Sequence, residues 1–211
     1  MTNNYYISFD ISTTNVGISL WDESGVLVEL KHLALIVNKS VPQEERDIEK
    51  AVLFTEYIST LKKQIEELYD ANIIEVFVEA PLSNTPKNIN TTALLLGFNG
   101  MCKLKLYEVF GVKPKLISIY DSRRLFCPEL IVFDKRTKKH VLRFPEGYKS
   151  KEKKEYIRQK VATLEPNIEW FYTRNNTIKD SSYDMSDSYC VGISGLITMG
   201  IIDQEKVFFN P

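Results

Sequence analysis

Four acidic side chains stand where their neighbours predict buried structure, and carboxylates in such places can do chemistry. Asp10 interrupts the apolar segment YYISFDI, and Glu79 ends a second apolar segment, IIEVFVE. Asp184 and Asp187 are three residues apart at the start of a predicted helix, so both carboxylates point the same way from adjacent turns. A buried ionised carboxylate is costly unless it is paired or holds a cation, which makes these acids candidates for a functional site.

Each acid also has an ordinary structural explanation when it is taken alone. Asp10 could be a hydrogen-bonded structural residue, and Glu79 an exposed acid at a strand end. Asp184 and Asp187 suit the first turn of a helix, where capping and the helix dipole favour negative charge. The functional interpretation therefore depends on the four side chains meeting in space.

If they meet, the chemistry of the donors selects the ion. Carboxylates within about 4 Å of one another repel by about 4 kcal/mol per pair at an effective dielectric constant of about 20, so a cation must be bound. Oxygen ligands select Mg²⁺ or Mn²⁺ rather than zinc. His32 and His140 are isolated, and Cys102, Cys127 and Cys190 lack paired spacing, so we expect reduced thiols and neither a zinc site nor a disulfide framework.

The first half of the chain predicts three antiparallel strands and then a parallel crossover. Residues 5–22 form two strands joined by a tight polar turn, and residues 26–37 are apolar and β-prone enough for a third. Residues 45–69 place apolar side chains on one stripe of a helix, and residues 73–79 form a short buried strand. Strand, helix and strand imply a parallel pair, with Glu79 at the crevice beyond the strand ends.

The second half predicts helices and strands with one insertion. The expected elements are a loop at 81–92, a helix from there to 110, a strand at 112–119, an inserted β-hairpin at 121–147, a basic helix at 149–164 and a last helix at 183–199. We therefore expect an α/β fold, with a mixed sheet flanked by helices, in a single domain over residues 1–211.

Length and composition fit one globular domain inside the cell. The chain has 211 residues, of which 26% are charged, and no apolar run approaches the length of a membrane span. The N-terminal MTNN lacks the regions of a secretory signal, so we expect a cytoplasmic protein. The net charge of -1 hides an uneven distribution, because residues 135–154 carry nine Lys or Arg against two Glu. Such a segment suits a polyanion, although a solvated basic loop would have the same composition.

Three motifs together resemble the RuvC-like Holliday junction resolvases of the RNase H-like superfamily. They are the Asp of the first hairpin (FDISTTNVGIS), the Glu that ends the fourth strand (VFVEAP) and the Asp-x-x-Asp of the last helix (YDMSDSYCVGIS). KNINTTALLLGFNG and KSKEKKEYIRQKV resemble two further family segments, an Asn-containing helix start and a lysine-led helix. The resemblance covers most of the chain from Tyr5 to Met199. The hairpin insertion and the loop after Glu79 depart from the family pattern.

The resemblance implies an RNase H-like fold and a metal-dependent endonuclease that hydrolyses phosphodiesters in four-way or other branched DNA. In the family mechanism Asp10 would bridge two Mg²⁺ or Mn²⁺ ions, and Glu79, Asp184 and Asp187 would complete their shells. One ion would lower the pKa of an attacking water and the other would stabilise the leaving 3′ oxygen, so that products carry 5′ phosphates.

The resemblance also implies DNA contacts and partners. The expected phosphate contacts come from Lys87, Asn88, Lys149, Lys151, Lys153 and Lys154. Lys154 matches the family lysine best, with Lys151 and Lys153 as competitors. The expected partners are branched DNA and a second copy of the chain, with the apolar helix over 94–110 as a dimer contact and with neither a membrane nor a nucleotide cofactor.

Two other classes share parts of this pattern. FDISTTNVGISLWD also resembles the phosphate loop of actin-like and sugar-kinase-type phosphotransferases, although such enzymes usually contain two related domains and a second Gly-rich loop. A non-catalytic DNA-binding module could keep the fold and the basic insertion without needing all four acids. Within the nucleases, cleavage of RNA in hybrids or of DNA flaps stays open.

Overall fold

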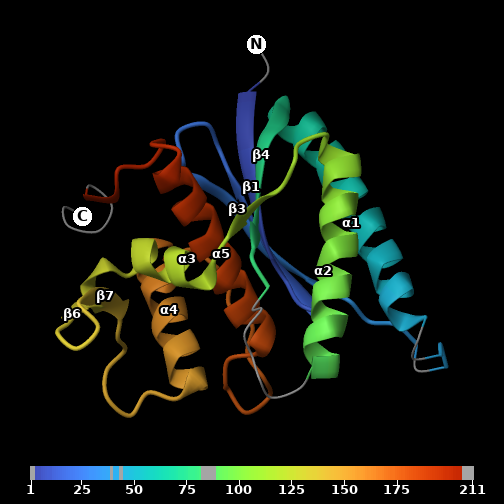
Figure 1. Cartoon of the computed structure of the whole chain (residues 1–211). Coiled ribbons are helices and arrows are strands. Elements are labelled where there is room, and N and C mark those ends of the chain that lie inside the picture. Colours follow the sequence, from blue (N-terminus) through green and yellow to red (C-terminus); the bar gives the residue numbers. More distant parts are fainter. Residues whose placement is uncertain (1–2, 39, 43–44, 82–88, 206–211) are drawn as a thin grey trace.

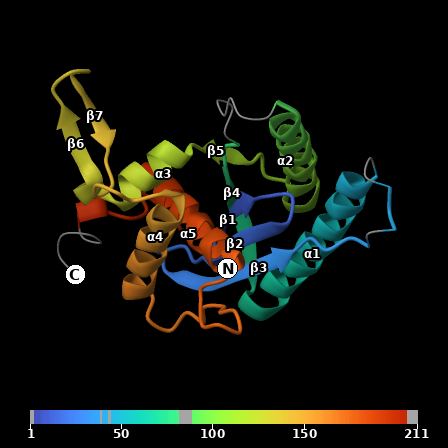
Figure 2. The same ribbon diagram turned by 90° about the horizontal axis from the view of Figure 1, so that it is seen from below.

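A mixed five-stranded sheet forms the centre of the computed structural model, which describes residues 3–38, 40–42, 45–81 and 89–205. Its strands are β1 (Asn3–Ile11), β2 (Asn15–Trp21), β3 (Leu27–Ala34), β4 (Ala71–Glu79) and β5 (Lys115–Ile117). The order across the sheet is β3-β2-β1-β4-β5; Figure 1 labels β1, β3 and β4, and Figure 2 labels all five strands. The pairs β1–β2 and β2–β3 are antiparallel, whereas β1–β4 and β4–β5 are parallel. The fold is therefore the RNase H-like α/β fold that was expected, with three antiparallel strands before the parallel ones.

Helices cover both faces of the sheet (Figure 2). The elements on one face are α1 (Arg46–Tyr69) and α2 (Ile89–Phe110), and those on the other are α3 (Ile119–Phe126), α4 (Ser150–Leu164) and α5 (Asp180–Thr198). Ile7 and Phe9 of β1 join the core under α1 and α2, whereas Tyr6 joins the core under α3, α4 and α5. In the described part of the chain, no helix is both long enough and apolar enough to cross a membrane.

Small side chains let α5 lie directly on β1 and β2. The hydroxyls of Ser8 and Ser19 contact each other, and both donate to the carbonyl oxygen of Ser188, at 2.9 and 3.1 Å. A Cβ atom at Gly17 would lie 1.9 Å from the carbonyl oxygen of Asp184, so only glycine allows this approach. Gly17 pairs with Asp10 across the β1–β2 ladder. The close packing therefore places the first turns of α5 beside Asp10.

The segment predicted as an insertion contains more than a hairpin. The hairpin consists of β6 (Ile131–Asp134) and β7 (Lys139–Leu142), which confirms the expected inserted pair of strands. Before it, α3 begins after Ser118, whose hydroxyl accepts the backbone N–H of Asp121, and a 3₁₀ turn (Pro128–Leu130) follows. Ser122 and Phe126 of α3 are buried. The sequence did not predict α3, because its apolar pattern is too short to show a helical period.

Cysteines and histidines take structural positions. Cys102, Cys127 and Cys190 are buried free thiols, in agreement with the expected reduced state. His32 lies in β3 with its ring against that of Phe171, and His140 is exposed in β7. Neither histidine lines the cleft described below.

Candidate active site

The four acids singled out by the sequence converge on one cleft of about 220 Å³. Asp10 comes from the end of β1 and Glu79 from the end of β4, and the two strands run parallel with Phe9 beside Val78. The remaining two acids, Asp184 and Asp187, come from the first turns of α5. The full lining is Asp10, Ile11, Ser12, Glu79, Ala80, Pro81, Leu95, Asn99, Ile119, Arg123, Lys154, Asp184 and Asp187.

The acids are removed from water to different extents. Asp184 and Asp187 expose only 8% and 6% of their surface, whereas Asp10 and Glu79 are half-buried. Both Asp184 and Asp187 belong to a helix that is buried along most of its length. An acid in the first turn of an exposed helix would need no further explanation, but these two face the interior. Their burial therefore removes the simple capping explanation for this pair.

Burial and mutual repulsion raise the pKa values of three of the carboxyls. Burial raises the pKa of Asp10 well above its usual range, and the other three carboxylates add to the rise. Burial, and then the charge of Asp187, raises the pKa of Glu79 to about 8 although two nearby cations oppose the rise. Burial raises the pKa of Asp184 to about 6, with a nearby lysine opposing and Asp187 adding. The cleft therefore favours the binding of protons or of other positive charge.

Two basic side chains enter the cleft beside Asp187. Nη2 of Arg123 lies 3.5 Å from one carboxylate oxygen of Asp187, and Nζ of Lys154 lies 3.7 Å from the other. Burial lowers the pKa of Lys154, but the neighbouring carboxylates, Asp187 first, outweigh burial and raise it. Arg123 and Lys154 cannot neutralise four ionised carboxylates, so the cleft would keep a net negative charge that bound metal ions could offset.

The donor set fits a hard divalent cation by its chemistry. All four acids offer carboxylate oxygens, the ligands that Mg²⁺ and Mn²⁺ prefer, and the raised pKa values show that negative charge there is poorly compensated. Within the described ranges, however, no three His, Cys, Asp or Glu side chains are already arranged around a common point as metal ligands. Coordination would therefore require rotation of side chains that already share the cleft.

Arg123 is a cleft residue that sequence analysis missed. Its side chain is 15% exposed, and its buried Nε atom has no hydrogen-bond partner in the described part of the protein. It comes from α3, directly after β5, so it lies beyond a strand end next to that of Glu79. Crevices outside the carboxyl ends of parallel strands collect functional groups, and this placement was the signal that could have identified Arg123.

Asn99 is the second residue that was missed. It is 2% exposed, and its Nδ2 donates to the carbonyl oxygens of Ile11 at 3.2 Å and of Leu95 at 3.3 Å. Because both partners can only accept, the amide orientation is fixed, and Oδ1 is left buried and without a partner among the described residues. Asn99 thus ties α2 to the residue after Asp10. The signal was one amide in the apolar run LLLGFNGMC.

The six predicted DNA contacts fall into different environments. Lys87 and Asn88 lie outside the described residues. Lys149 and Lys151 are exposed at the start of α4, and Lys153 is half-buried with Nζ 5.7 Å from the centre of the Phe144 ring. Lys154 alone of the three competing lysines lines the cleft. The structure therefore distinguishes Lys154 from Lys151 and Lys153, which the sequence could not do.

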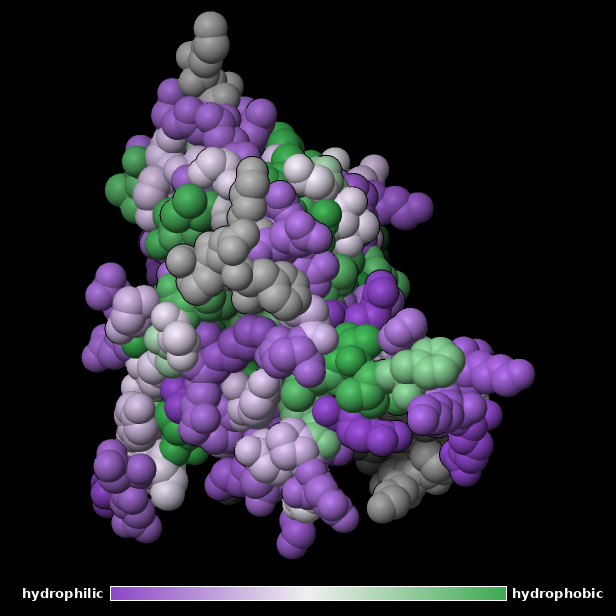
Figure 3. All heavy atoms as spheres, turned by 90° about the vertical axis from the view of Figure 1, so that its left-hand side faces the viewer, coloured by the Kyte–Doolittle hydropathy of each residue, from purple (hydrophilic) through white to green (hydrophobic). Residues whose placement is uncertain are grey.

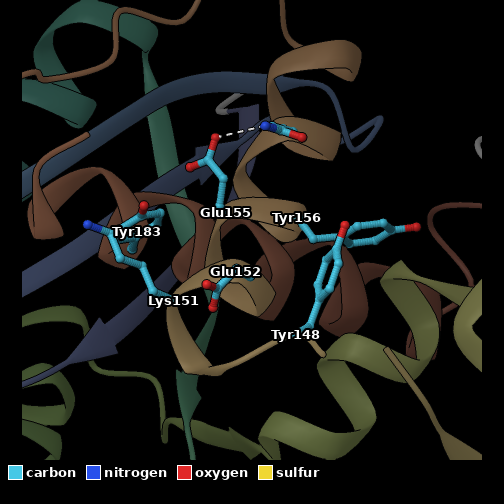
Figure 4. Close-up of a pocket in the computed structure, with 7 residues that line it drawn as sticks. Tyr148, Lys151, Glu152, Glu155, Tyr156 and Tyr183 are labelled. Atoms are coloured by element: carbon cyan, nitrogen blue, oxygen red, sulfur yellow. Dashed lines mark hydrogen bonds between the residues drawn. The ribbon is translucent and has the colours of Figure 1, made fainter. Parts of the chain in front are cut away.

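A second hollow of about 350 Å³ lies along α4 (Figure 4). It is lined by Tyr148, Lys151, Glu152, Glu155, Tyr156, Gln159 and Tyr183. Glu155 is already paired, because Arg158 donates to it at 2.7 and 3.0 Å and Gln159 at 3.0 Å. None of the four converging acids lines this hollow. The candidate metal ligands therefore all lie in the cleft of about 220 Å³ and not in this larger hollow.

Comparison with known proteins shows that this chain has the fold of some solved structures. No protein-family model matches the sequence, and no curated protein does. Among solved structures, Thermus thermophilus RuvC in complex with a Holliday junction substrate is similar at a TM-score of 0.54 with 9% identity, over 93% of this chain and 96% of that one. A second structure of Thermus thermophilus RuvC gives a TM-score of 0.49 with 10% identity over the same shares of the two chains.

Proteins of another activity are also similar over part of the chain. A ROK hexokinase from Thermus thermophilus gives a TM-score of 0.34 with 13% identity, over 61% of this chain and 39% of that one. Identities this low show the fold alone. What the cleft does must be argued from its own residues.

Proposed function

We propose that this chain is a divalent-metal-dependent endonuclease that cleaves branched DNA, four-way junctions in the first place. The observation that carries the proposal is the convergence of four acids on one cleft, from two parallel strand ends and one helix. They are Asp10, Glu79, Asp184 and Asp187, and the basic side chains of Arg123 and Lys154 line the same cleft. A fold similar to that of a RuvC solved with a Holliday junction substrate supports it. Hydrolysis would leave 5′ phosphates.

The four acids, Asp10, Glu79, Asp184 and Asp187, would together hold two Mg²⁺ or Mn²⁺ ions. When bound, such ions supply a water of lowered pKa for in-line attack and stabilise charge on the leaving 3′ oxygen. Asp10 would be a principal ligand, because the other three carboxylates all repel its negative charge and a bound cation would offset that repulsion. Glu79 and Asp184, with pKa values of about 8 and about 6, would bind a cation in competition with protons.

Lys154 and Arg123 would contact the scissile phosphate from their positions beside Asp187. Both already lie within 4 Å of Asp187, and neither distance is short enough for a good hydrogen bond, which needs about 2.7–3.2 Å. The guanidinium of Arg123 carries several N–H donors in a planar fork, which suits the oxygens of a phosphate. Lys149, Lys151 and Lys153 would contact phosphates farther along the strand without reading sequence.

The protein would act as a homodimer, because a four-way junction presents two symmetric strands for cutting. The exposed apolar side chains of α1 and α2 offer a surface for a second copy. Ile48, Val52 and Leu104 are 58%, 46% and 55% exposed, and they line a hollow of about 410 Å³ between the two helices. This surface agrees with the helix over 94–110 as a dimer contact.

The direct test incubates the full chain with labelled four-way junction, flap, duplex and RNA–DNA hybrid, each with Mg²⁺, Mn²⁺ or EDTA. We expect paired nicks in the junction with either ion and none in EDTA. Asp10→Asn should bind the junction at least as tightly as the parent and should not cut it. Equal cutting by Asp10→Asn would remove this carboxylate from the mechanism.

The same preparation separates the nuclease from its rivals. An actin-like or sugar-kinase-type phosphotransferase would be protected against melting by ATP with Mg²⁺ and would leave the junction intact. A non-catalytic module would bind the junction and cut nothing under any ion. Preferential cleavage of flaps or hybrids would keep the chemistry and change the substrate.

A further inference from the structure

The β6–β7 hairpin carries a concentration of basic side chains that the active-site cleft does not use. Between Ile131 and Arg143 there are five Lys or Arg against one acid, Asp134. The five are Lys135, Arg136, Lys138, Lys139 and Arg143, and all are exposed. None of them forms an ion pair with a residue in the described part of the chain, whereas Arg123, Lys154, Arg158 and Lys160 all do.

The hairpin is an ordered projection. Its strands pair from Ile131 with Leu142 to Asp134 with Lys139. Asp134 closes the turn, because its carboxylate accepts the backbone N–H groups of Arg136 at 2.8 Å and Thr137 at 3.4 Å. These bonds lower the pKa of Asp134, so the acid stays charged within the turn. Binding by such an arm would cost little ordering entropy.

The hairpin is tied to the elements that build the cleft. The hydroxyl of Tyr120 in α3 donates to the carbonyl oxygen of His140 at 2.9 Å, and Arg123 lies one turn later in the same helix. On its other side, Phe144 packs edge-on against Tyr156 of α4, the helix that carries Lys154. The basic arm thus extends from the two helices whose cations enter the cleft.

The cations lie on one side of the molecule. The hairpin projects beside α3 and α4 and away from α1 and α2 (Figures 1 and 2). Figure 3 looks at that side of the molecule, and hydrophilic side chains cover most of it, with apolar patches between them. Like charges gathered on a short hairpin repel one another, and a partner with regularly spaced negative charges would relieve that repulsion.

We infer that the β6–β7 hairpin binds the phosphate backbone of a duplex DNA arm that leaves the active-site cleft. The inference rests on the proposed function and adds a second, sequence-independent contact outside the cleft. Phosphates fit better than an acidic protein surface, because long basic side chains along the turn and the second strand of the hairpin match a regular line of charge without side-chain complementarity.

The test compares two double variants of the full chain that each lose two positive charges. Lys135→Gln/Lys139→Gln removes charge from the hairpin, and neither position has left-handed backbone, unlike Lys138 with φ 54°. The matched control, Lys63→Gln/Lys113→Gln, removes two exposed lysines at the end of α1 and just before β5. Both variants should melt like the parent, because all four side chains are exposed and form no ion pair within the described ranges.

Binding to a labelled four-way junction is measured by anisotropy in EDTA, so that no cutting occurs, over a series of KCl concentrations. Each phosphate contact contributes about 0.9 to the slope of log K against log salt, so the hairpin variant should lose up to about 1.8 of slope. The control should keep the parent's slope. At saturating protein in Mg²⁺, the hairpin variant should nick at the parent's rate.

The outcomes separate the inference from the function on which it rests. A hairpin variant with the same slope as the control, on a parent that binds and cuts junctions, overturns the hairpin contact and leaves the nuclease standing. A parent that binds no DNA at any salt concentration overturns the proposed function and the hairpin contact together.

Discussion

Arg123 shows how much depends on the position of one side chain. Arg123 and Arg124 are neighbours in α3, yet Arg123 is 15% exposed beside Asp187 in the cleft, whereas Arg124 is 47% exposed and 3.8 Å from Asp121. Only Arg123 lines the cleft together with the four acids. The pair therefore offers a test in which charge, length and helix are held constant.

We expect Arg123→Gln to lower the nicking rate of bound junction by about 10²–10³-fold, the usual cost of removing one group that stabilises developing charge. Junction affinity should change much less, since most phosphate contacts lie elsewhere. Arg124→Gln should nick at the parent's rate. Single-turnover cleavage at saturating protein measures both variants, and equal losses in the two would exclude a specific role for Arg123.

The raised pKa of Glu79 predicts how the free energy of unfolding changes with pH in the absence of metal. Its pKa rises from the ordinary 4.5 to about 8 in the folded protein. Because the folded state holds this proton more tightly than the unfolded state, the stability that it contributes is complete below about pH 4.5 and is lost as the pH rises toward 8. With EDTA present, the melting temperature should therefore fall across this range.

Two comparisons isolate the contribution of Glu79. Glu79→Gln cannot ionise, so its melting temperature should fall less between about pH 5 and pH 8 than that of the parent. Mn²⁺ should raise the melting temperature of the parent, and by more at pH 8 than at pH 5, because protons compete with the ion at low pH. Parallel pH profiles for the parent and the variant would refute the raised pKa.

At the scale of an element, α5 reaches the cleft because β2 has a glycine, Gly17, at the position that α5 covers. A Cβ atom at Gly17 would meet the Asp184 carbonyl oxygen at 1.9 Å, whereas Gly97 in α2 has no neighbour within 4 Å of such an atom. Alanine would therefore clash at position 17 and fit without a clash at position 97.

Gly17→Ala should destabilise the protein by about 1–3 kcal/mol, the usual cost of overpacking, and should weaken Mn²⁺ binding because the first turns of α5 must shift. Gly97→Ala should stabilise it by about 0.5–1 kcal/mol, because alanine is the better helix former. Denaturant unfolding measures both changes. Loss of Mn²⁺ binding without loss of stability in Gly17→Ala would separate the two effects.

Over the whole molecule, the sequence predicted the features that leave a local pattern of apolar and charged residues. The apolar stripe of α1 and the apolar segments of β1 and β2 indicated the layers, and Asp10 and Glu79 stood out because a charge interrupted or ended an apolar run. Arg123 escaped because α3 has only eight residues, too few to show a period among charged neighbours. Asn99 escaped because its unpaired oxygen results from contacts with Ile11, 88 residues away in sequence. Contacts at that range leave no local pattern.

The exposed apolar surface of α1 and α2 is the place to test the proposed dimer. Leu104 is 55% exposed beside the hollow between these helices, whereas Leu68 is 70% exposed in the last turn of α1 and does not line that hollow. If the proposed dimer uses this surface, Leu104→Glu buries a charge at the contact and should shift the protein to a monomer in sedimentation velocity, while Leu68→Glu should not. The monomer should still nick, because each cleft is built within one chain, but nicks on the two opposed strands should lose their coordination. If both Leu104→Glu and Leu68→Glu stay dimeric, the dimer contact lies on another face. If the parent is monomeric at every concentration, the proposed dimer is wrong.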